Sequence, residues 1–185
     1  MLNNVQKLIR RDLVLKLSLD NFHELPTLSK ASLNLSNKFI SAEKSLILPY
    51  FLACSLWTGQ RPQIVRAKKS VASFQLKEKA LFGCKVTLRK QSLARFVSRL
   101  FFAVLPNLQK SSFLNFGFFH ENKVDFGLES FLQCLEIQST PEMFDFVKGC
   151  SVSLETTGNC TKINQVFLSG FCFPISKKNI SYGKL

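Results

Sequence analysis

The chain has 185 residues, 46% of them hydrophobic, and its 25 Lys and Arg residues against 12 Asp and Glu residues give a net charge of +13. This length allows one domain with a packed core, and the apolar content excludes an intrinsically disordered chain. The longest apolar run, residues 46–54, is too short for a transmembrane helix, so we expect no membrane insertion.

The first part of the chain predicts a helix followed by a strand. Apolar residues recur at helical spacing over residues 4–18. This basic, amphipathic segment also fits a mitochondrial presequence, although Asp12 argues against one. Residues 27–35 alternate as a strand, with Leu33 pointing one way and Asn34 the other.

A second helix is expected between residues 41 and 57. Because proline lacks an amide proton and clashes with the preceding turn, Pro49 makes this helix either start late or kink. Gly59 suits its C-terminal cap, and Pro62 follows shortly afterwards.

The clearest strand pattern lies in residues 70–90, as two runs joined by a loop around residues 79–83. In the first run Phe74 and Leu76 alternate with polar residues. In the second run Cys84, Val86 and Leu88 form an apolar face. They alternate with Lys85, Thr87 and Arg89, which form a polar face. We expect the apolar face to pack inward and the basic face to remain exposed.

Residues 91–105 predict a strongly amphipathic helix that Pro106 ends. Arg95 and Arg99 share one side of it. Its apolar stripe consists of Leu93, Phe96, Val97, Leu100, Phe101 and Val104.

The remaining chain predicts further strands and one short helix. Residues 112–131 resemble a Phe-rich strand pair that turns at residues 121–122. Residues 150–157 alternate as a strand, and Asn159 suits the cap of a helix over about residues 161–169. After Gly170, a last strand is expected at residues 171–173.

Taken together, these elements predict an α+β fold. We expect a mostly antiparallel sheet with helices packed on one side, and with a basic sheet face and a hairpin loop exposed. Neither internal repeats nor low-complexity linkers stand out, so residues 1–185 are expected to form a single domain. Its basic centre spans residues 59–99, and a strand–helix–strand unit spans about residues 147–174.

The excess charge is concentrated in residues 61–99, which contain 11 basic residues and a single acid, Glu78. Such a concentration of positive charge requires a polyanion to neutralise it, and nucleic acid is the usual polyanion. The alternative is a solvated surface that binds nothing in particular. This concentration of charge on patterned, foldable sequence favours nucleic-acid binding.

Catalytic and metal-binding patterns are missing from the sequence. The six cysteines form no C-x-x-C pair, and with only two histidines no zinc-ligand spacing arises. Free, mostly buried thiols in a reducing compartment are expected, and Cys84 falls on an apolar face. We therefore predict no enzyme, no metal and no cofactor.

Three motifs in the central region resemble a known family. They are Gly59-Gln60-Arg61-Pro62, then Ala67-Lys68-Lys69-Ser70-Val71-Ala72 with Phe74, then Gly83-Cys84-Lys85-Val86-Thr87-Leu88-Arg89. In this order and spacing they resemble the 5S-rRNA-binding protein of the large ribosomal subunit, the universal family numbered five. Weaker similarity covers most of the chain, including residues 26–35, 147–149, 154–157 and 170–174. The basic start falls where the family has its first helix.

The resemblance implies a non-enzymatic ribosomal protein of the central protuberance. Its expected partners are 5S rRNA and large-subunit rRNA, P-site tRNA, a small-subunit head protein at an intersubunit bridge, and neighbouring large-subunit proteins. By position, the implied rRNA-binding residues are Lys30, Asn34, Gln60, Arg61, Arg66, Lys68, Lys69, Lys85, Thr87 and Arg89. The implied tRNA-facing loop runs from residue 76 to residue 82, with Leu76, Lys77, Lys79 and Phe82.

The sequence departs from the family pattern in two places. Residues 36–39 replace a glycine-rich turn of bacterial members. Residues 107–130 are less basic and richer in Phe, which suggests a bridge rebuilt around apolar protein contacts. This divergence indicates an organellar version in the mitochondrial matrix ribosome, with a plastid or a bacterial-type cytoplasm as alternatives. A local rRNA replacement for 5S rRNA, or a non-ribosomal RNA- or protein-binding module with the same basic face, also stays open.

Overall fold

The computed structural model describes residues 2–17, 21–41, 43–74, 76–107, 118–119, 122–130, 134–158 and 160–173. It divides into two compact units. Unit 1 consists of Met1–Ala31, Arg89–Phe126 and Ser153–Leu185, and unit 2 of Ser32–Leu88 and Gly127–Val152. Nowhere in these ranges is a helix long and apolar enough to cross a membrane.

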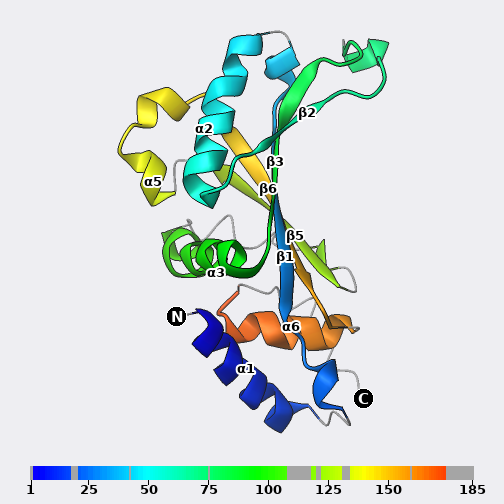
Figure 1. Cartoon of the computed structure of the whole chain (residues 1–185), viewed down its shortest axis with the longest axis vertical. Helices are drawn as coiled ribbons and strands as arrows, with labels where there is room; N and C mark the ends of the chain where they lie inside the picture. Colours follow the sequence, from blue (N-terminus) through cyan, green and yellow to red (C-terminus); the bar gives the residue numbers. More distant parts are fainter. Residues whose placement is uncertain are drawn as a thin grey trace. The chain divides into compact units, whose positions relative to one another are not determined.

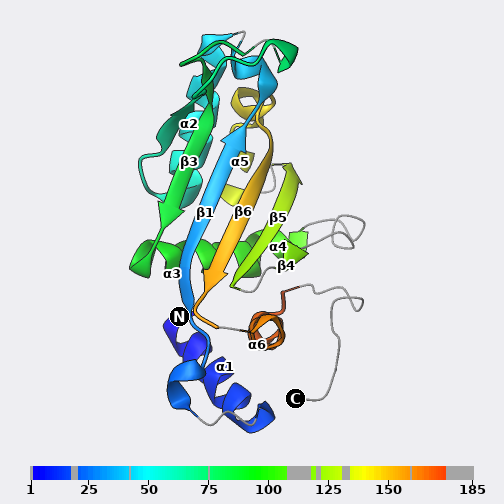
Figure 2. The same cartoon turned by 90° about the vertical axis from the view of Figure 1, so that its right-hand side faces the viewer.

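The strands form one six-stranded sheet in the order β2-β3-β1-β6-β5-β4. Neighbouring strands run in opposite directions, as Figure 2 shows for β3, β1, β6 and β5. The expected α+β fold with an antiparallel sheet is therefore confirmed. The strands are β1 (Leu28–Ser36), β2 (Gln63–Arg66), β3 (Leu81–Leu88), β4 (Phe118–Phe119), β5 (Lys123–Ser130) and β6 (Lys148–Thr156).

Unit 2 is built around α2 (Ile47–Thr58), which packs against β3. Pro49 lies in the first turn of α2, where an amide proton would have no partner within the helix, so this helix starts late as expected. Gly59 caps α2 with φ 66°, and its amide donates to the Ser55 carbonyl at 2.8 Å. In Figure 1, α2 and α5 (Leu135–Gln138) lie on the same side of the strands of this unit.

The longer helices of unit 1 pack against one another. α1 (Leu2–Lys16) contacts both α3 (Lys90–Arg99) and α6 (Thr161–Gly170). α3 continues through a π-helical turn (Leu100–Val104) into α4 (Leu105–Asn107), so the helical path runs past Pro106. All six residues of the predicted apolar stripe in this stretch are buried.

Two expectations near the C-terminus are wrong. Residues 171–173 form a turn instead of a strand, because Phe171 and Phe173 both pack onto the ring of Phe101, with centroid distances of 5.4 and 6.0 Å. Cys160 occupies the N-cap position of α6, and Asn159 lies outside the described residues.

The prediction of a strand in the first part of residues 70–90 is also wrong. Residues 72–74 form a 3-10 turn, and only a single bridge joins Val71 to Leu76. β3 pairs instead with β2, which the sequence did not predict. The expected loop ends at residue 80, because β3 begins at residue 81. Of the Phe-rich pair, β4 and β5 are antiparallel as expected, and residues 112–117, 120–121 and 131 lie outside the described residues.

Candidate nucleic-acid interface

Strand β3 sorts its side chains as the sequence predicts. Cys84, Val86 and Leu88 are buried, whereas Lys85 and Thr87 are exposed. This separation follows from the two-residue period of a strand, with α2 covering the apolar face. Arg89 directly follows β3 and is also exposed.

The pairing of β2 with β3 adds a residue that the sequence did not single out. Gln63 lies opposite Lys85, and Val65 lies opposite Gly83. Residues directly opposite in an antiparallel pair point to the same face, so the Gln63 amide shares the face of the Lys85 ammonium. Only the strand register could identify Gln63, because its local sequence carries no strong strand signal.

Strand β1 lies on the other side of β3 and approaches it closely at Gly83. A Cβ atom at Gly83 would collide with the Leu35 carbonyl oxygen and would lie 2.9 Å from the Ser36 Cα atom. The first residue of the G-C-K-V-T-L-R motif must therefore be glycine to let these strands meet. On β1, Leu33 is buried and Asn34 is half-buried on the opposite face. We call Asn34, Gln63, Lys85 and Thr87 of unit 2 the strand face.

The β2–β3 hairpin continues beyond its strands into a closed tip, described at residues 67–74 and 76–80. Ala67 and Ala80 are joined by a hydrogen bond of 2.9 Å, and Val71 and Leu76 exchange two bonds of 3.0 and 3.1 Å. Lys79 adopts a left-handed backbone with φ 63°. Figure 1 shows this hairpin tip projecting past the strands of unit 2. The tip is therefore a structured projection and not a loose loop.

The hairpin is strongly basic. Residues 61–85 contain seven basic residues and one acid, Glu78. All seven basic side chains are exposed: Arg61, Arg66, Lys68, Lys69, Lys77, Lys79 and Lys85. Leu76 and Phe82 are half-buried, as is Gln60 in the turn that links the α2 cap to β2. The charges therefore point to solvent, where a polyanion can reach them.

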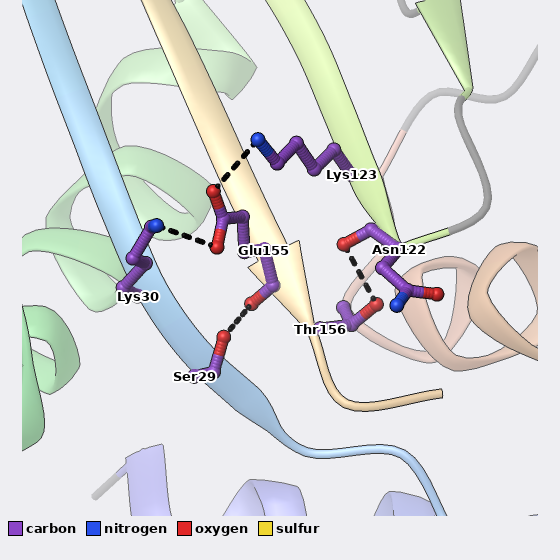
Figure 3. A network of polar contacts seen from close by, with 6 residues as sticks. All are labelled: Ser29, Lys30, Asn122, Lys123, Glu155 and Thr156. Atoms are coloured by element: carbon purple, nitrogen blue, oxygen red, sulfur yellow. Dashed lines mark hydrogen bonds and ion pairs between the residues drawn. The ribbon is translucent and has the colours of Figure 1, made fainter. Parts of the chain in front are cut away.

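Lys30 has a different environment, in unit 1. Its ammonium lies 2.8 Å from a carboxylate oxygen of Glu155, and Lys123 lies 3.1 Å from the other oxygen (Figure 3). Burial raises the pKa of the Glu155 carboxyl, but the hydrogen bonds and the positive charges of the two lysines together outweigh burial and leave that pKa below its ordinary value. The ion pair with Glu155 holds the Lys30 ammonium in an intramolecular network, and the Lys30 side chain is 33% exposed.

The sequence alone does not assign Lys123 or Glu155 to any site. Glu155 belongs to a short L-E-T-T match to the family, which is the one available signal. Together with Lys30 these residues carry a net charge of +1. Within the described ranges no three His, Cys, Asp or Glu residues are grouped so that they could hold a metal ion.

Comparisons with known proteins identify the family. Residues 81–175 match the model of the C-terminus of the ribosomal L5 protein family. The chain is also 32% identical over 176 residues to the large ribosomal subunit protein uL5m of Reclinomonas americana, covering 94% of this chain and 96% of the relative. The chain belongs to the ribosomal L5 family. It is a structural, non-enzymatic constituent of the large ribosomal subunit.

Membership of the L5 family decides between the alternatives that the sequence left open. It favours a ribosomal protein over a non-ribosomal binding module, with rRNA and neighbouring ribosomal proteins as partners. The similarity to a mitochondrial relative supports the predicted mitochondrial location over a plastid or a bacterial-type cytoplasm. The L5 model match begins at β3, and the match to uL5m extends over most of the chain.

Proposed function

We propose that the strand face binds 5S rRNA, or a local rRNA replacement, in the central protuberance of the mitochondrial large subunit. The observation that carries this proposal is the alternation along β3. It exposes Lys85 and Thr87 on the strand that lies between β2, which carries Gln63, and β1, which carries Asn34, while the apolar side chains pack against α2.

The chemistry of the strand face suits a folded RNA. Double-helical RNA is recognised mostly by its shape, through phosphates and 2′-hydroxyl groups across the shallow minor groove. Lys85 supplies a cation for phosphate. Thr87, Asn34 and Gln63 supply groups that both donate and accept hydrogen bonds, which matches a 2′-hydroxyl. Gln60, Arg61, Arg66 and Arg89 would add contacts at the ends of β2 and β3.

We further propose that the hairpin tip approaches P-site tRNA. Its four exposed lysines, Lys68, Lys69, Lys77 and Lys79, stand on a hydrogen-bonded projection, which suits contact with a second RNA. In this proposal Lys68 and Lys69 also serve rRNA, while Leu76 to Phe82 faces tRNA. The contact with a small-subunit head protein at an intersubunit bridge rests on the family resemblance and involves residues 107–130.

The test is sedimentation of mitochondrial lysate at raised salt, probing for this chain and for small RNAs. We expect the chain in the large-subunit fraction together with a 5S-like RNA. If the chain sediments with the large subunit but without such an RNA, the ligand of the strand face would be assigned to other rRNA instead of 5S rRNA. Ultraviolet cross-linking in that fraction should join Lys85 to rRNA, and cross-links confined to α2 would overturn the assignment of the strand face.

A further inference from the structure

Three neighbouring strands of the sheet each contribute one charged side chain to the network in Figure 3. Strand β6 lies between β1 and β5 and carries Glu155, while Lys30 stands on β1 and Lys123 on β5. One carboxylate therefore receives two ammonium groups, one from each side, at 2.8 and 3.1 Å. All three residues belong to unit 1. We call Lys30, Lys123 and Glu155 the lysine clamp.

The backbone beneath the lysine clamp is tied together on both sides of β6. The Ser29 hydroxyl on β1 donates to the Glu155 carbonyl oxygen at 3.0 Å. On the other side, the Thr156 amide and hydroxyl donate to the carbonyl oxygen of Asn122, just before β5, at 2.9 and 3.4 Å. These bonds fix the strand positions from which the charged side chains extend (Figure 3). A ligand therefore meets a site that is ordered by the fold, which lowers the cost of binding.

The lysine clamp presents positive charge to solvent. The Glu155 side chain is 18% exposed, whereas those of Lys30 and Lys123 are 33% and 52% exposed. One lysine is enough to neutralise Glu155, so the second leaves a net charge of +1. Asp125, the other acid of β5 in unit 1, is half-buried and is not an ion-pair partner of either lysine in the described part of the chain. An approaching ligand therefore meets a cationic group.

The two ammonium groups retain hydrogen-bond donors for a ligand. Each carries three N–H donors, and the contact with Glu155 uses one of them. An exposed ion pair contributes little to stability, so linking the strands does not by itself require a second lysine. A phosphate group offers a fork of anionic oxygens, as a carboxylate does, and therefore suits the same pair of ammonium groups. With one phosphodiester bound, the charges of the site sum to zero.

We propose that the lysine clamp binds a backbone phosphate of large-subunit rRNA. Lys30 and Lys123 donate to the phosphate oxygens, and Glu155 is a positioning residue that holds the two ammonium groups together. RNA is the occupant because rRNA is a partner of the family and because folded RNA is recognised largely through its phosphates. The inference goes beyond the proposed function, since it adds an rRNA contact in unit 1 that does not depend on the strand face of unit 2.

The salt dependence of binding to protein-free rRNA from the mitochondrial large subunit tests this inference with the full chain. Lys123→Gln should weaken binding and lower the slope of log affinity against log salt concentration by about one, because one phosphate contact is lost. Lys123→Arg keeps the charge and should keep the slope. The matched control, Lys16→Gln on α1, removes another exposed charge of unit 1 and should also keep it. An unchanged slope for Lys123→Gln, or an equal loss for Lys16→Gln, would overturn the inference.

Lys85→Gln in the same assay reports separately on the strand face. A lowered slope for Lys85→Gln together with an unchanged slope for Lys123→Gln would overturn this inference and leave the proposed function intact. The reverse pattern would support the lysine clamp and count against the proposed function alone.

Glu155→Gln tests the positioning role through the sign of its effect. Loss of a negative charge by itself should strengthen binding to RNA. If Glu155 aligns the two lysines, the substitution should instead weaken binding, because the ammonium groups are no longer held together. Stronger binding would show that Glu155 only screens the lysines, and it would refute the positioning role.

Amine labelling of purified large subunits separates RNA from protein as the occupant. Lys30 and Lys123 should react slowly with acetic anhydride in intact subunits and faster after nuclease digestion, as measured by mass spectrometry of the peptides. Slow reaction that survives digestion would assign the lysine clamp to a protein neighbour and overturn the inference. Fast reaction in the intact subunit would show that nothing covers the lysines, and would overturn it as well.

Discussion

Replacement of Gly83 by alanine should destabilise the protein through a backbone collision. The added Cβ atom would meet the Leu35 carbonyl oxygen and the Ser36 Cα atom, and neither can move without shifting β1. Overpacking of this kind costs about 1–3 kcal/mol, and alanine recovers about 0.4–1 kcal/mol by restricting the unfolded chain. We therefore expect a net loss of about 1–2 kcal/mol in the free energy of unfolding. For a chain of this size, the melting temperature should then fall by about 2–8 °C.

The assay is thermal unfolding followed by circular dichroism, with Gly127→Ala as the matched control. Gly127 is also a strand glycine, but a Cβ atom there would meet only the Cys150 carbonyl oxygen, at an ordinary 3.9 Å. The control should melt close to the wild-type protein. If Gly83→Ala and Gly127→Ala melted at the same temperature, the close approach of β1 and β3 would not explain the glycine.

Three further predictions concern a cap, a carboxylate and the thiols. Gly59→Ala should lower the free energy of unfolding by about 1 kcal/mol, because φ 66° is strained for alanine even though the added Cβ atom would meet nothing within 4 Å. A denaturant titration measures this change, and an unchanged midpoint would refute the prediction. Glu155→Gln should lower the free energy of unfolding by up to about 1 kcal/mol at pH 7. Since the folded-state pKa of Glu155 is lowered, its contribution disappears as the pH falls through that pKa, so urea titrations of the two proteins should converge in acid. Burial raises the pKa of the Cys54 thiol to about 12, whereas Cys160 and Cys172 are exposed. Alkylation of the folded protein at pH 8, followed by mass spectrometry, should therefore modify Cys160 and Cys172 first. Rapid modification of Cys54 would contradict its burial.

The sequence could predict the elements whose signal is local. The alternation of Cys84, Val86 and Leu88 with polar residues is enough to orient β3, because side-chain direction in a strand depends only on its period. Likewise, Pro49 and Gly59 mark the beginning and end of α2 through backbone constraints that act within one turn. The exposed position of Lys85 and Thr87 follows from the same local pattern.

Features that depend on pairing between distant segments could not be predicted. β2 is four residues long and exposed throughout, so it lacks the inward and outward alternation that identifies a strand. The Phe74 to Leu76 pattern suggested a strand where the chain makes a tight turn. The ion pair of Lys30 with Glu155 joins residues 125 positions apart, and only the register of β1 and β6 brings them together.

Helix α2 illustrates a third kind of difficulty. Leu48, Leu52 and Leu56 lie in the apolar run 46–54 and just beyond it, and apolar residues in a short run are normally assigned to the core. The structure shows that α2 turns Leu48, Leu52 and Leu56 away from the strands. Apolar periodicity thus indicates which residues avoid water but not whether another chain covers them.

The most direct test of the central claim is the salt dependence of 5S rRNA binding by the wild-type chain and by Lys85→Gln. If Lys85 neutralises a phosphate, its loss should weaken binding and lower the slope of log affinity against log salt concentration by about one. The control Lys44→Gln removes another exposed charge, from the 3-10 turn before α2, and should leave the slope unchanged. Identical affinities and slopes for Lys85→Gln and the wild-type chain would contradict the assignment of the strand face to rRNA.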